Sequence, residues 1–286
     1  MDTVVLPKNV KMDFLNDLSE YLDPSAIAWY ADRGIAYRRT YLLHGRPGTG
    51  KSSLSFAAAG HFNLDIYVLN LANISDATLQ GLLAKLPARC IVLLEDIDAI
   101  ETTKSRVDAT VSNQQPTADN VTLSGLLNAL DGVASNEGRV LIMTTNYVDR
   151  IDEAVIRAGR VDKMIEFGFA SQEILQGLFR FIYMPLATEN EADEAGKDNR
   201  AIEELAAAFA DRVPGMRFSP AQVLSFLIEH KKSPQAAVEK VIPWVEKEGD
   251  ESIPLRRQTL PTSETSSIQY TEISVDSLLM DTWVSS

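Results

Sequence analysis

Residues 45–52 read Gly45-Arg46-Pro47-Gly48-Thr49-Gly50-Lys51-Ser52, which is the pattern G-x-x-x-x-G-K-S. The pattern follows the apolar run Thr40-Tyr41-Leu42-Leu43-His44 and precedes a helical stretch that begins near Ser53. A strand, a glycine-rich loop and a helix in this order bind phosphate, because the glycines let backbone N–H groups converge on phosphate oxygens. Lys51 is expected to reach the outer phosphates, and the Ser52 hydroxyl is expected to ligate Mg²⁺. We therefore predict a nucleotide site that runs from Gly45 to Ser53.

The composition limits the class of protein. A chain of 286 residues with 45% hydrophobic content can bury one α/β core and a smaller second subdomain. The net charge of −13 argues against a nucleic-acid partner, because an acidic surface repels phosphate. The single cysteine, Cys90, lies in an apolar run and is interpreted as a small buried side chain in a reducing compartment. No run approaches the ~18 apolar residues that span a bilayer, and the start does not resemble a signal or targeting peptide.

Apolar runs alternate with helical patterns along the first two thirds of the chain, which is typical of a parallel sheet. We expect strands near residues 41–44, 65–71, 90–95, 140–145 and 164–167. Helices are expected at residues 52–61, 76–86, 122–130, 152–157 and 171–181. Their predicted N-caps are Ser75, either Thr122 or Ser124, and Ser171.

Composition also predicts where the subdomains end. Residues 1–188 are expected to form an α/β core, with a polar, disordered insertion at about 101–120. After a charged linker at 189–200, helical patterns at 202–213, 219–231 and 234–247 predict a small helical lid within residues 189–248. The tail at 249–286 is expected to be mostly disordered, although residues 270–283 keep apolar side chains that could dock weakly.

Two adjacent carboxylates end the predicted strand Ile91-Val92-Leu93-Leu94-Glu95-Asp96. Behind a phosphate loop, one such acid holds Mg²⁺ and the other polarises the attacking water. The usual order in this motif is Asp then Glu, and here it is reversed. By position, Glu95 is expected to serve the metal together with Ser52, and Asp96 to activate the water, while Asp98 could replace either acid.

Polar residues also follow the next strand. Asn146 ends the run Leu141-Ile142-Met143-Thr144-Thr145-Asn146, so it is expected at the carboxyl edge of the sheet, where it could hold the lytic water or a γ-phosphate oxygen. Arg157 and Arg160 flank a glycine in Arg157-Ala158-Gly159-Arg160-Val161-Asp162. Arginine neutralises charge on a transferring phosphate, so each is either a sensor in its own site or a finger in a neighbour's site.

These motifs together resemble the AAA-type ATPases over about residues 5–247. Three further stretches resemble the Bcs-type branch, the mitochondrial inner-membrane chaperones that help insert the Rieske subunit during respiratory complex III assembly. They are Trp29-Tyr30-Ala31-Asp32-Arg33-Gly34-Ile35-Ala36-Tyr37-Arg38-Arg39, the inverted Leu94-Glu95-Asp96-Ile97-Asp98, and Leu123-Ser124-Gly125-Leu126-Leu127-Asn128-Ala129-Leu130-Asp131-Gly132-Val133. In that branch the reversed acids are a shared trait.

The resemblance implies a P-loop sheet of order 5-1-4-3-2, a helical lid and Mg²⁺-dependent hydrolysis of ATP to ADP and phosphate. It implies a homo-oligomeric ring, a hexamer or a heptamer, in which Arg157 and Arg160 reach a neighbour's ATP. It also implies a protein client, a role in chaperoning, complex assembly or translocation, and a place at the mitochondrial inner membrane. The branch's N-terminal membrane helix and the domain that follows it do not precede this ATPase region, so a membrane would be reached only through a segment outside this chain.

Two departures from the family pattern bear on function. Arg46 stands where proline is more common, and residues 70–76 lack the aromatic-apolar-glycine loop with which threading ATPases grip unfolded chains. The alternative function is a nucleotide-gated assembly module that binds ATP and scarcely hydrolyses it. A P-loop kinase would need an acceptor pocket and a different arrangement of lid arginines.

Overall fold

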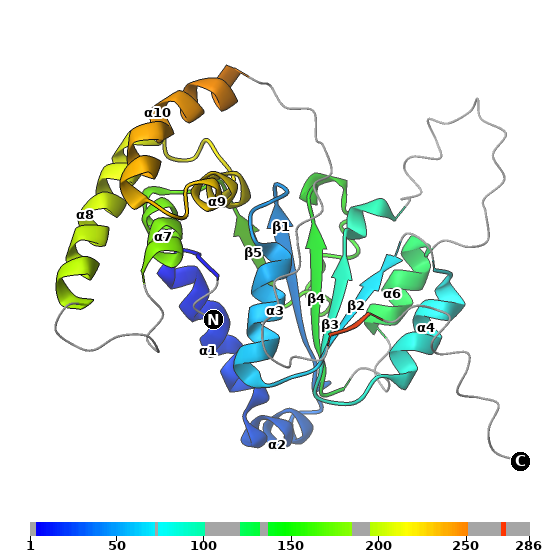
Figure 1. Cartoon of the computed structure of the whole chain (residues 1–286). Helices are drawn as coiled ribbons and strands as arrows, with labels where there is room; N and C mark the ends of the chain where they lie inside the picture. The colour runs from blue at the N-terminus through cyan, green and yellow to red at the C-terminus, as the bar shows by residue number, and fades with distance from the viewer. Residues whose placement is uncertain are drawn as a thin grey trace, which may run out of the picture.

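A parallel sheet forms the centre of the larger subdomain (Figure 1). The computed structural model describes residues 4–71, 74–100, 121–131, 137–184, 195–250 and 270–272. The strands are β1 (Arg39–Gly45), β2 (Ile66–Asn70), β3 (Ile91–Glu95), β4 (Val140–Thr145), β5 (Lys163–Phe167) and β6 (Tyr270–Glu272). Their spatial order is β5-β1-β4-β3-β2-β6, and all neighbours are parallel. The predicted order 5-1-4-3-2 is confirmed, with β6 added beside β2.

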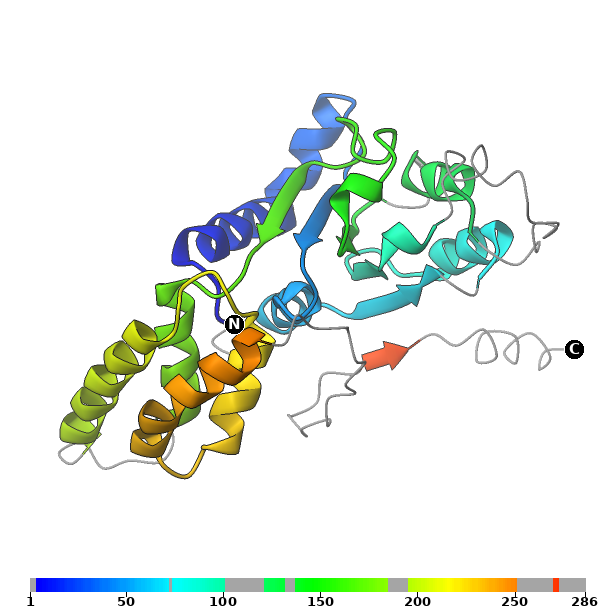
Figure 2. The same cartoon turned by 90° about the horizontal axis from the view of Figure 1, so that it is seen from above.

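Helices cover both faces of this sheet. They are α1 (Lys8–Leu22), α2 (Pro24–Asp32), α3 (Lys51–Phe62), α4 (Asp76–Lys85) and α6 (Leu123–Asp131). Side chains alternate along β1, so that Tyr41 and Leu43 pack in one core with α1 and α3, whereas Leu42 packs in the opposite core with α4 and α6. Figure 2 shows α3 and the pair α4 and α6 on opposite sides of the strands. The sheet is therefore buried on both faces.

A partly buried ion cluster ties α1 to the sheet. Asp17 of α1 accepts hydrogen bonds from Arg39 and Tyr41 of β1 and pairs with Lys163 of β5, whose Nζ lies 2.8 Å from the carboxylate. Burial acts to raise the pKa of Asp17, but the hydrogen bonds from Arg39, Lys163 and Tyr41 outweigh it and leave that pKa below its usual value. The cluster anchors the chain segment that leads into β1.

Hydrogen bonds at the helix starts confirm the predicted caps. The side chains of Ser75 and Ser171 each accept a backbone N–H from the first turn of α4 and α7. Of the two alternatives for α6, Thr122 is the one in place, because its hydroxyl accepts the N–H of Gly125 at 3.0 Å, and Ser124 lies inside the helix.

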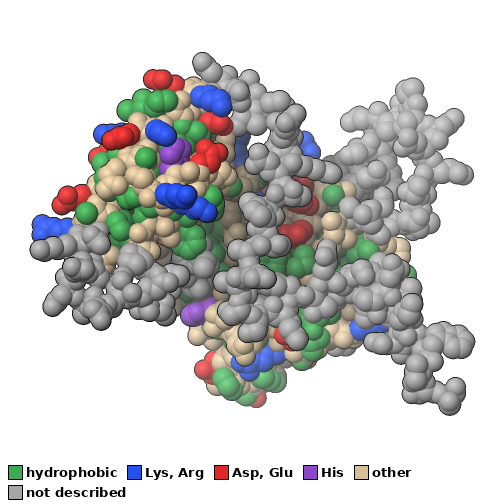
Figure 3. Space-filling view, in the orientation of Figure 1, with side chains coloured by type: hydrophobic (Ala, Val, Ile, Leu, Met, Phe, Trp, Pro, Cys, Tyr) green, Lys and Arg blue, Asp and Glu red, His purple; other side chains and the backbone are tan. Residues whose placement is uncertain are grey.

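The second subdomain is a bundle of α7 (Gln172–Tyr183), α8 (Ala195–Arg212), α9 (Pro220–Glu229) and α10 (Pro234–Asp250). Aromatic side chains in mutual contact fill its core, among them Phe179, Phe209, Phe226 and Trp244. On the face shown in Figure 3, the basic, acidic and apolar side chains of this bundle are interspersed. None of the helices in the described part of the chain is both long and apolar enough to cross a membrane.

The structure differs from the sequence predictions in several places. Residues 152–157 form turns where a helix was expected, because the Asp152 carboxylate accepts the N–H of Ala154 and the carbonyl of Ala154 accepts the side chain of Arg160. The predicted linker at 189–200 is helical from Ala195 onward. Helices α1 and α2 were not predicted.

The expected tail also contains ordered positions. Helix α10 continues to Asp250, and Tyr270–Glu272 pair with β2. The insertion at 101–120 and the other residues of the tail lie outside the described residues.

Gly45 lies where the fold has no room for a side chain. Its φ is +135°, and a Cβ placed there would lie 2.0 Å from the backbone oxygen of Phe167 on β5. We expect Gly45→Ala to destabilise the protein by about 2 kcal/mol or more and to lower its melting temperature by several degrees. Gly81→Ala in α4 is the matched control, because a Cβ there meets no atom within 4 Å and alanine favours a helix by roughly 0.5–1 kcal/mol. Equal melting temperatures for the two variants would contradict the prediction.

Candidate phosphate-binding site

The glycine-rich loop joins β1 to α3 in the strand–loop–helix order that the sequence predicted (Figure 1). Gly48 and Gly50 have φ of +75° and +102°, conformations that other residues rarely adopt, and Thr49 is buried with its hydroxyl on the Arg46 carbonyl at 2.7 Å. Gly50 is the N-cap of α3 and provides no side-chain cap. The first N–H groups of α3, which begin with Lys51, are therefore left for an anion.

Lys51 is buried and makes three hydrogen bonds within the chain. Its Nζ donates to the carbonyls of Gly45 and Arg46 at 2.7 and 3.1 Å and to Oδ1 of Asn146 at 2.7 Å. Burial lowers the pKa of Lys51, while the charges of Asp96 and Asp98 act in the opposite direction. A phosphate that binds Lys51 must therefore replace some of these contacts.

Ser52 and Glu95 face each other across the start of α3 and the end of β3. The Ser52 hydroxyl donates to Oε1 of Glu95 at 2.5 Å, whereas Ser53 is exposed. These oxygen donors fit Mg²⁺, which usually takes one or two carboxylates together with substrate phosphates and keeps several waters. The structure thus brings together the two residues that the sequence predicted as metal ligands.

Asp96 adopts a left-handed backbone conformation directly after β3, with φ of 50° and ψ of 51°. Aspartate tolerates this region better than most residues. The N–H of Asp96 donates to the hydroxyl of Thr144 on the neighbouring β4, which fixes the turn, and the exposed carboxylate accepts Nδ2 of Asn146 at 3.0 Å. The left-handed turn carries the shorter of the two acids to the side of the site where Asn146 lies.

Asn146 connects the lysine to the acid. Its amide oxygen accepts Lys51 and its amide nitrogen donates to Asp96, so the side chain bridges two predicted functional groups. The backbone N–H of Asn146 and the hydroxyl of Thr145 both donate to Oδ1 of Asp98, at 3.2 and 2.7 Å. Asp98 therefore fixes the backbone position of Asn146.

Sequence reasoning missed the roles of Thr144 and Thr145. The signal that could have found them is the pair of hydroxyl side chains at the end of a buried strand, immediately before Asn146. Both threonines are buried, and both orient a residue of the site by a hydrogen bond.

The structure separates the two arginines. Arg160 forms a bidentate pair with Asp131, with nitrogen–oxygen distances of 2.8 and 2.6 Å, and the pair raises the pKa of Arg160 and lowers that of Asp131. Arg157 is exposed, and its guanidinium has no partner among the residues that the structure describes. Neither arginine contacts the glycine-rich loop of its own chain.

The lid contacts the loop directly. The N–H of Ala221, in the first turn of α9, donates to the carbonyl of Gly48 at 3.0 Å. Arg46, beside the exposed Pro47, lies over the ring of Phe169 at 5.0 Å in the segment between β5 and α7. The loop is thus linked both to the lid and to the segment that joins β5 to α7. Arg217, between α8 and α9, is exposed and lies over the ring of its neighbour Phe218 at 5.6 Å.

Two known family models match the sequence of this chain. Residues 41–169 match the model of the ATPase family associated with various cellular activities (AAA), and residues 172–242 match the mitochondrial chaperone BCS1-like ATPase lid domain. The chain is 40% identical over 243 residues to the mitochondrial chaperone BCS1 of Bos taurus, which covers 84% of this chain and 54% of that protein. It is 39% identical over 245 residues to a probable mitochondrial chaperone BCS1-A of Dictyostelium discoideum, and this match covers 84% of this chain and 54% of that protein. The chain spans about half the length of these curated relatives.

Proposed function

Because this chain belongs to the AAA ATPase family and carries a BCS1-like lid domain, we propose that it binds ATP with Mg²⁺ and hydrolyses it to ADP and phosphate within a ring of identical subunits. The observation that carries the proposal is the Lys51–Asn146–Asp96 chain of hydrogen bonds beside the Ser52–Glu95 pair. It brings a phosphate-binding cation, a polar sensor and two acids to one edge of the sheet.

The loop holds the phosphates. The uncapped N–H groups at the start of α3 would donate to a phosphate beside Gly50, where a Cβ would meet no atom within 4 Å. Lys51 exchanges its contacts to the carbonyls of Gly45 and Arg46 for the β and γ phosphates. Since each exchange replaces a neutral acceptor by a charged one, the new hydrogen bonds are the stronger ones.

Glu95 and Asp96 have different roles in hydrolysis. Ser52 and Glu95 would hold Mg²⁺, which would neutralise phosphate charge when bound. Asp96 accepts a proton from the attacking water. Asn146 positions that water relative to the γ phosphate, since its side chain already bridges Lys51 and Asp96. Hydrolysis here depends on positioning and charge stabilisation.

A neighbouring subunit completes the site. Arg157 is exposed and has no partner among the described residues, so we assign it to the ATP of the next subunit in the ring. Arg160 follows it on the same segment, but its guanidinium is engaged by Asp131, so Arg157 is the better placed of the two. Oligomerisation and turnover are thereby coupled.

The client is a protein. Curated relatives at about 40% identity are named mitochondrial chaperones, and this supports a role in chaperoning or complex assembly in the mitochondrion. Closure of the lid is the means by which ATP acts on the ring, because α9 contacts the loop at Gly48 and Arg46 contacts Phe169 in the segment that leads from β5 to the lid.

Phosphate release measured over a wide range of protein concentration tests the function, with the oligomeric state followed in parallel. We expect turnover per subunit to rise as rings assemble and to vanish when Mg²⁺ is chelated. Assembled rings that bind ATP without releasing phosphate would support the nucleotide-gated assembly module in place of the ATPase.

A further inference from the structure

The segment that carries Arg157 is anchored to β1 at its C-terminal end. The N–H of Asp162 donates to the carbonyl of Thr40 at 3.0 Å, and the N–H of Thr40 donates back to the Asp162 carboxylate at 2.8 Å. This reciprocal pair fixes the segment just before β5. The turn at residues 157–160 is not part of this pair and is fixed by other groups.

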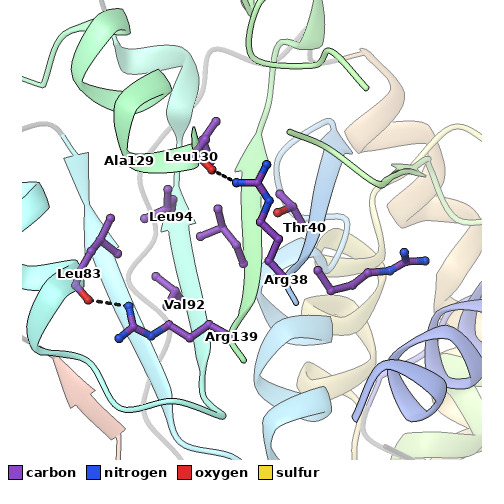
Figure 4. A pocket seen from close by; sticks show the side chains of 10 residues that line it. Arg38, Thr40, Leu83, Val92, Leu94, Ala129, Leu130 and Arg139 are labelled. Atoms are coloured by element: carbon purple, nitrogen blue, oxygen red, sulfur yellow. Dashed lines mark hydrogen bonds between the residues drawn. The ribbon is translucent and has the colours of Figure 1, made fainter. Parts of the chain in front are cut away.

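Two side chains hold that turn. Arg160 binds Asp131 at the end of α6 and also donates to the carbonyl of Ala154 at 2.5 Å. Arg38, the residue before β1, donates from Nη1 to the carbonyl of Leu130 in α6 and from Nη2 to the carbonyl of Gly159 in the turn. Figure 4 shows the Arg38 guanidinium reaching Leu130 across the apolar hollow between α6 and the sheet.

The backbone of Arg157 is therefore fixed while its side chain is free. Its carbonyl accepts the N–H groups of Arg160 and Val161 at 3.0 and 3.2 Å, and Gly159 closes the turn at a φ of +90°. Arg38 donates a hydrogen bond to the carbonyl of Gly159, two residues from Arg157, and so connects this turn to the last turn of α6. Arginine suits the task because its planar group presents several donors that can bridge two carbonyls at once.

We propose that Arg38 is a positioning residue for ATP hydrolysis in the neighbouring subunit, acting through Arg157 of its own chain. The inference rests on the proposed function, in which Arg157 serves the next site. Without Arg38 the turn is tied to α6 only by the Arg160–Asp131 pair, and Arg157 no longer meets the neighbour's γ phosphate at a fixed distance. A displacement of about 1 Å in such a group lowers turnover by up to roughly 100-fold.

The test uses subunit mixing. We expect Arg38→Ala to form rings and to bind ATP as the wild type does, and its turnover to fall about 10- to 100-fold with little change in KM. Asp96→Asn subunits cannot hydrolyse ATP, but they keep an intact Arg38 and Arg157. When they are mixed into Arg38→Ala rings, they should restore phosphate release at the sites that they adjoin.

Two further variants sharpen this test. Arg38→Lys keeps the charge and the stem but cannot span both carbonyls, so its turnover should lie between the wild type and Arg38→Ala. If Arg38→Ala does not fold, Arg38→Lys takes its place in the mixing experiment. Arg33→Ala is the matched control, because Arg33 is exposed and stacks on Trp29 at 4.2 Å, and we expect wild-type turnover from it.

Three results would overturn the inference. Wild-type turnover from both folded Arg38 variants would show that the bridge is dispensable. Failure of Asp96→Asn to rescue Arg38→Ala, when it does rescue Arg157→Ala, would place the action of Arg38 in its own site. Failure to rescue either variant would instead refute the assignment of Arg157 to the neighbour, and with it the proposed function in this form.

Discussion

Replacing Asp96 by asparagine is expected to leave nucleotide binding intact and to lower phosphate release at least about 100-fold, because a general base contributes roughly 10²–10⁴-fold to a rate. The substitution isolates the chemistry. Asparagine accepts the left-handed conformation that Asp96 adopts, and its amide oxygen can still accept Nδ2 of Asn146. The group that takes the proton is removed, together with its negative charge. Phosphate release and nucleotide affinity are measured on the same preparation.

Glu95→Gln is the comparison that assigns the two acids. The Ser52 hydroxyl lies 2.5 Å from Glu95, so the loss of the Glu95 charge should weaken Mg²⁺ binding, and excess Mg²⁺ should recover part of the turnover. Asp32→Asn, an exposed position at the end of α2, is the control for loss of charge. If Asp96→Asn turns over at the wild-type rate, Asp96 is not the base.

The second large effect is expected from Arg157→Ala. An arginine supplied to a transferring phosphate contributes about 10³–10⁵-fold to turnover, so the variant alone should be almost inactive while it still assembles and binds ATP. Mixed with Asp96→Asn subunits, it should recover activity, because some interfaces then pair intact acids with an intact arginine. Arg200→Ala, on the exposed face of α8, should behave as the wild type. An inactive mixture would show that Arg157 does not act across the interface.

The phosphate loop and the sheet order could be predicted because they depend on local pattern. The glycines that the loop requires adopt left-handed conformations at Gly48 and Gly50, and the buried strands appear as apolar runs. The ends of β1, β3 and β4 then had to meet, since parallel neighbours end at the same edge. Glu95 and Asn146 were therefore placed at this edge from sequence alone.

Contacts between distant residues could not be predicted in this way. The pairing of Arg160 with Asp131 joins positions 29 residues apart, and the bridge from Arg38 to Gly159 joins positions 121 apart. Neither residue type nor spacing distinguishes Arg157 from Arg160, although one is exposed and the other is engaged. Those differences depend on how α6 packs against the sheet.

Two local errors have physical causes. The helical pattern at 152–157 yields to turns because the Asp152 side chain caps a backbone N–H and Arg160 occupies a carbonyl that a helix would use. Helix α1 was missed although Phe14, Leu18 and Tyr21 follow helical spacing and are buried together.

The left-handed turn explains how the reversed acids can work. In the usual order the first acid serves the metal and the second the water, and we propose that Glu95, which accepts a hydrogen bond from Ser52, keeps the first role. Asp96 has a shorter side chain, but its backbone, fixed by Thr144, turns it toward Asn146. Asp96→Glu would lose this advantage, since glutamate favours the left-handed region less than aspartate does.

The central claim is that the glycine-rich loop and Lys51 bind the phosphates of a nucleotide, and calorimetric titration with a non-hydrolysable ATP analogue and Mg²⁺ tests it most directly. For folded wild-type protein we predict saturable binding at one site per chain. For Lys51→Ala, checked for folding by its melting temperature, we predict an affinity at least about 100-fold weaker, since the charge-assisted bonds to phosphate are lost. Equal affinity in the two proteins, or no binding by folded wild-type protein at two temperatures, would contradict the account.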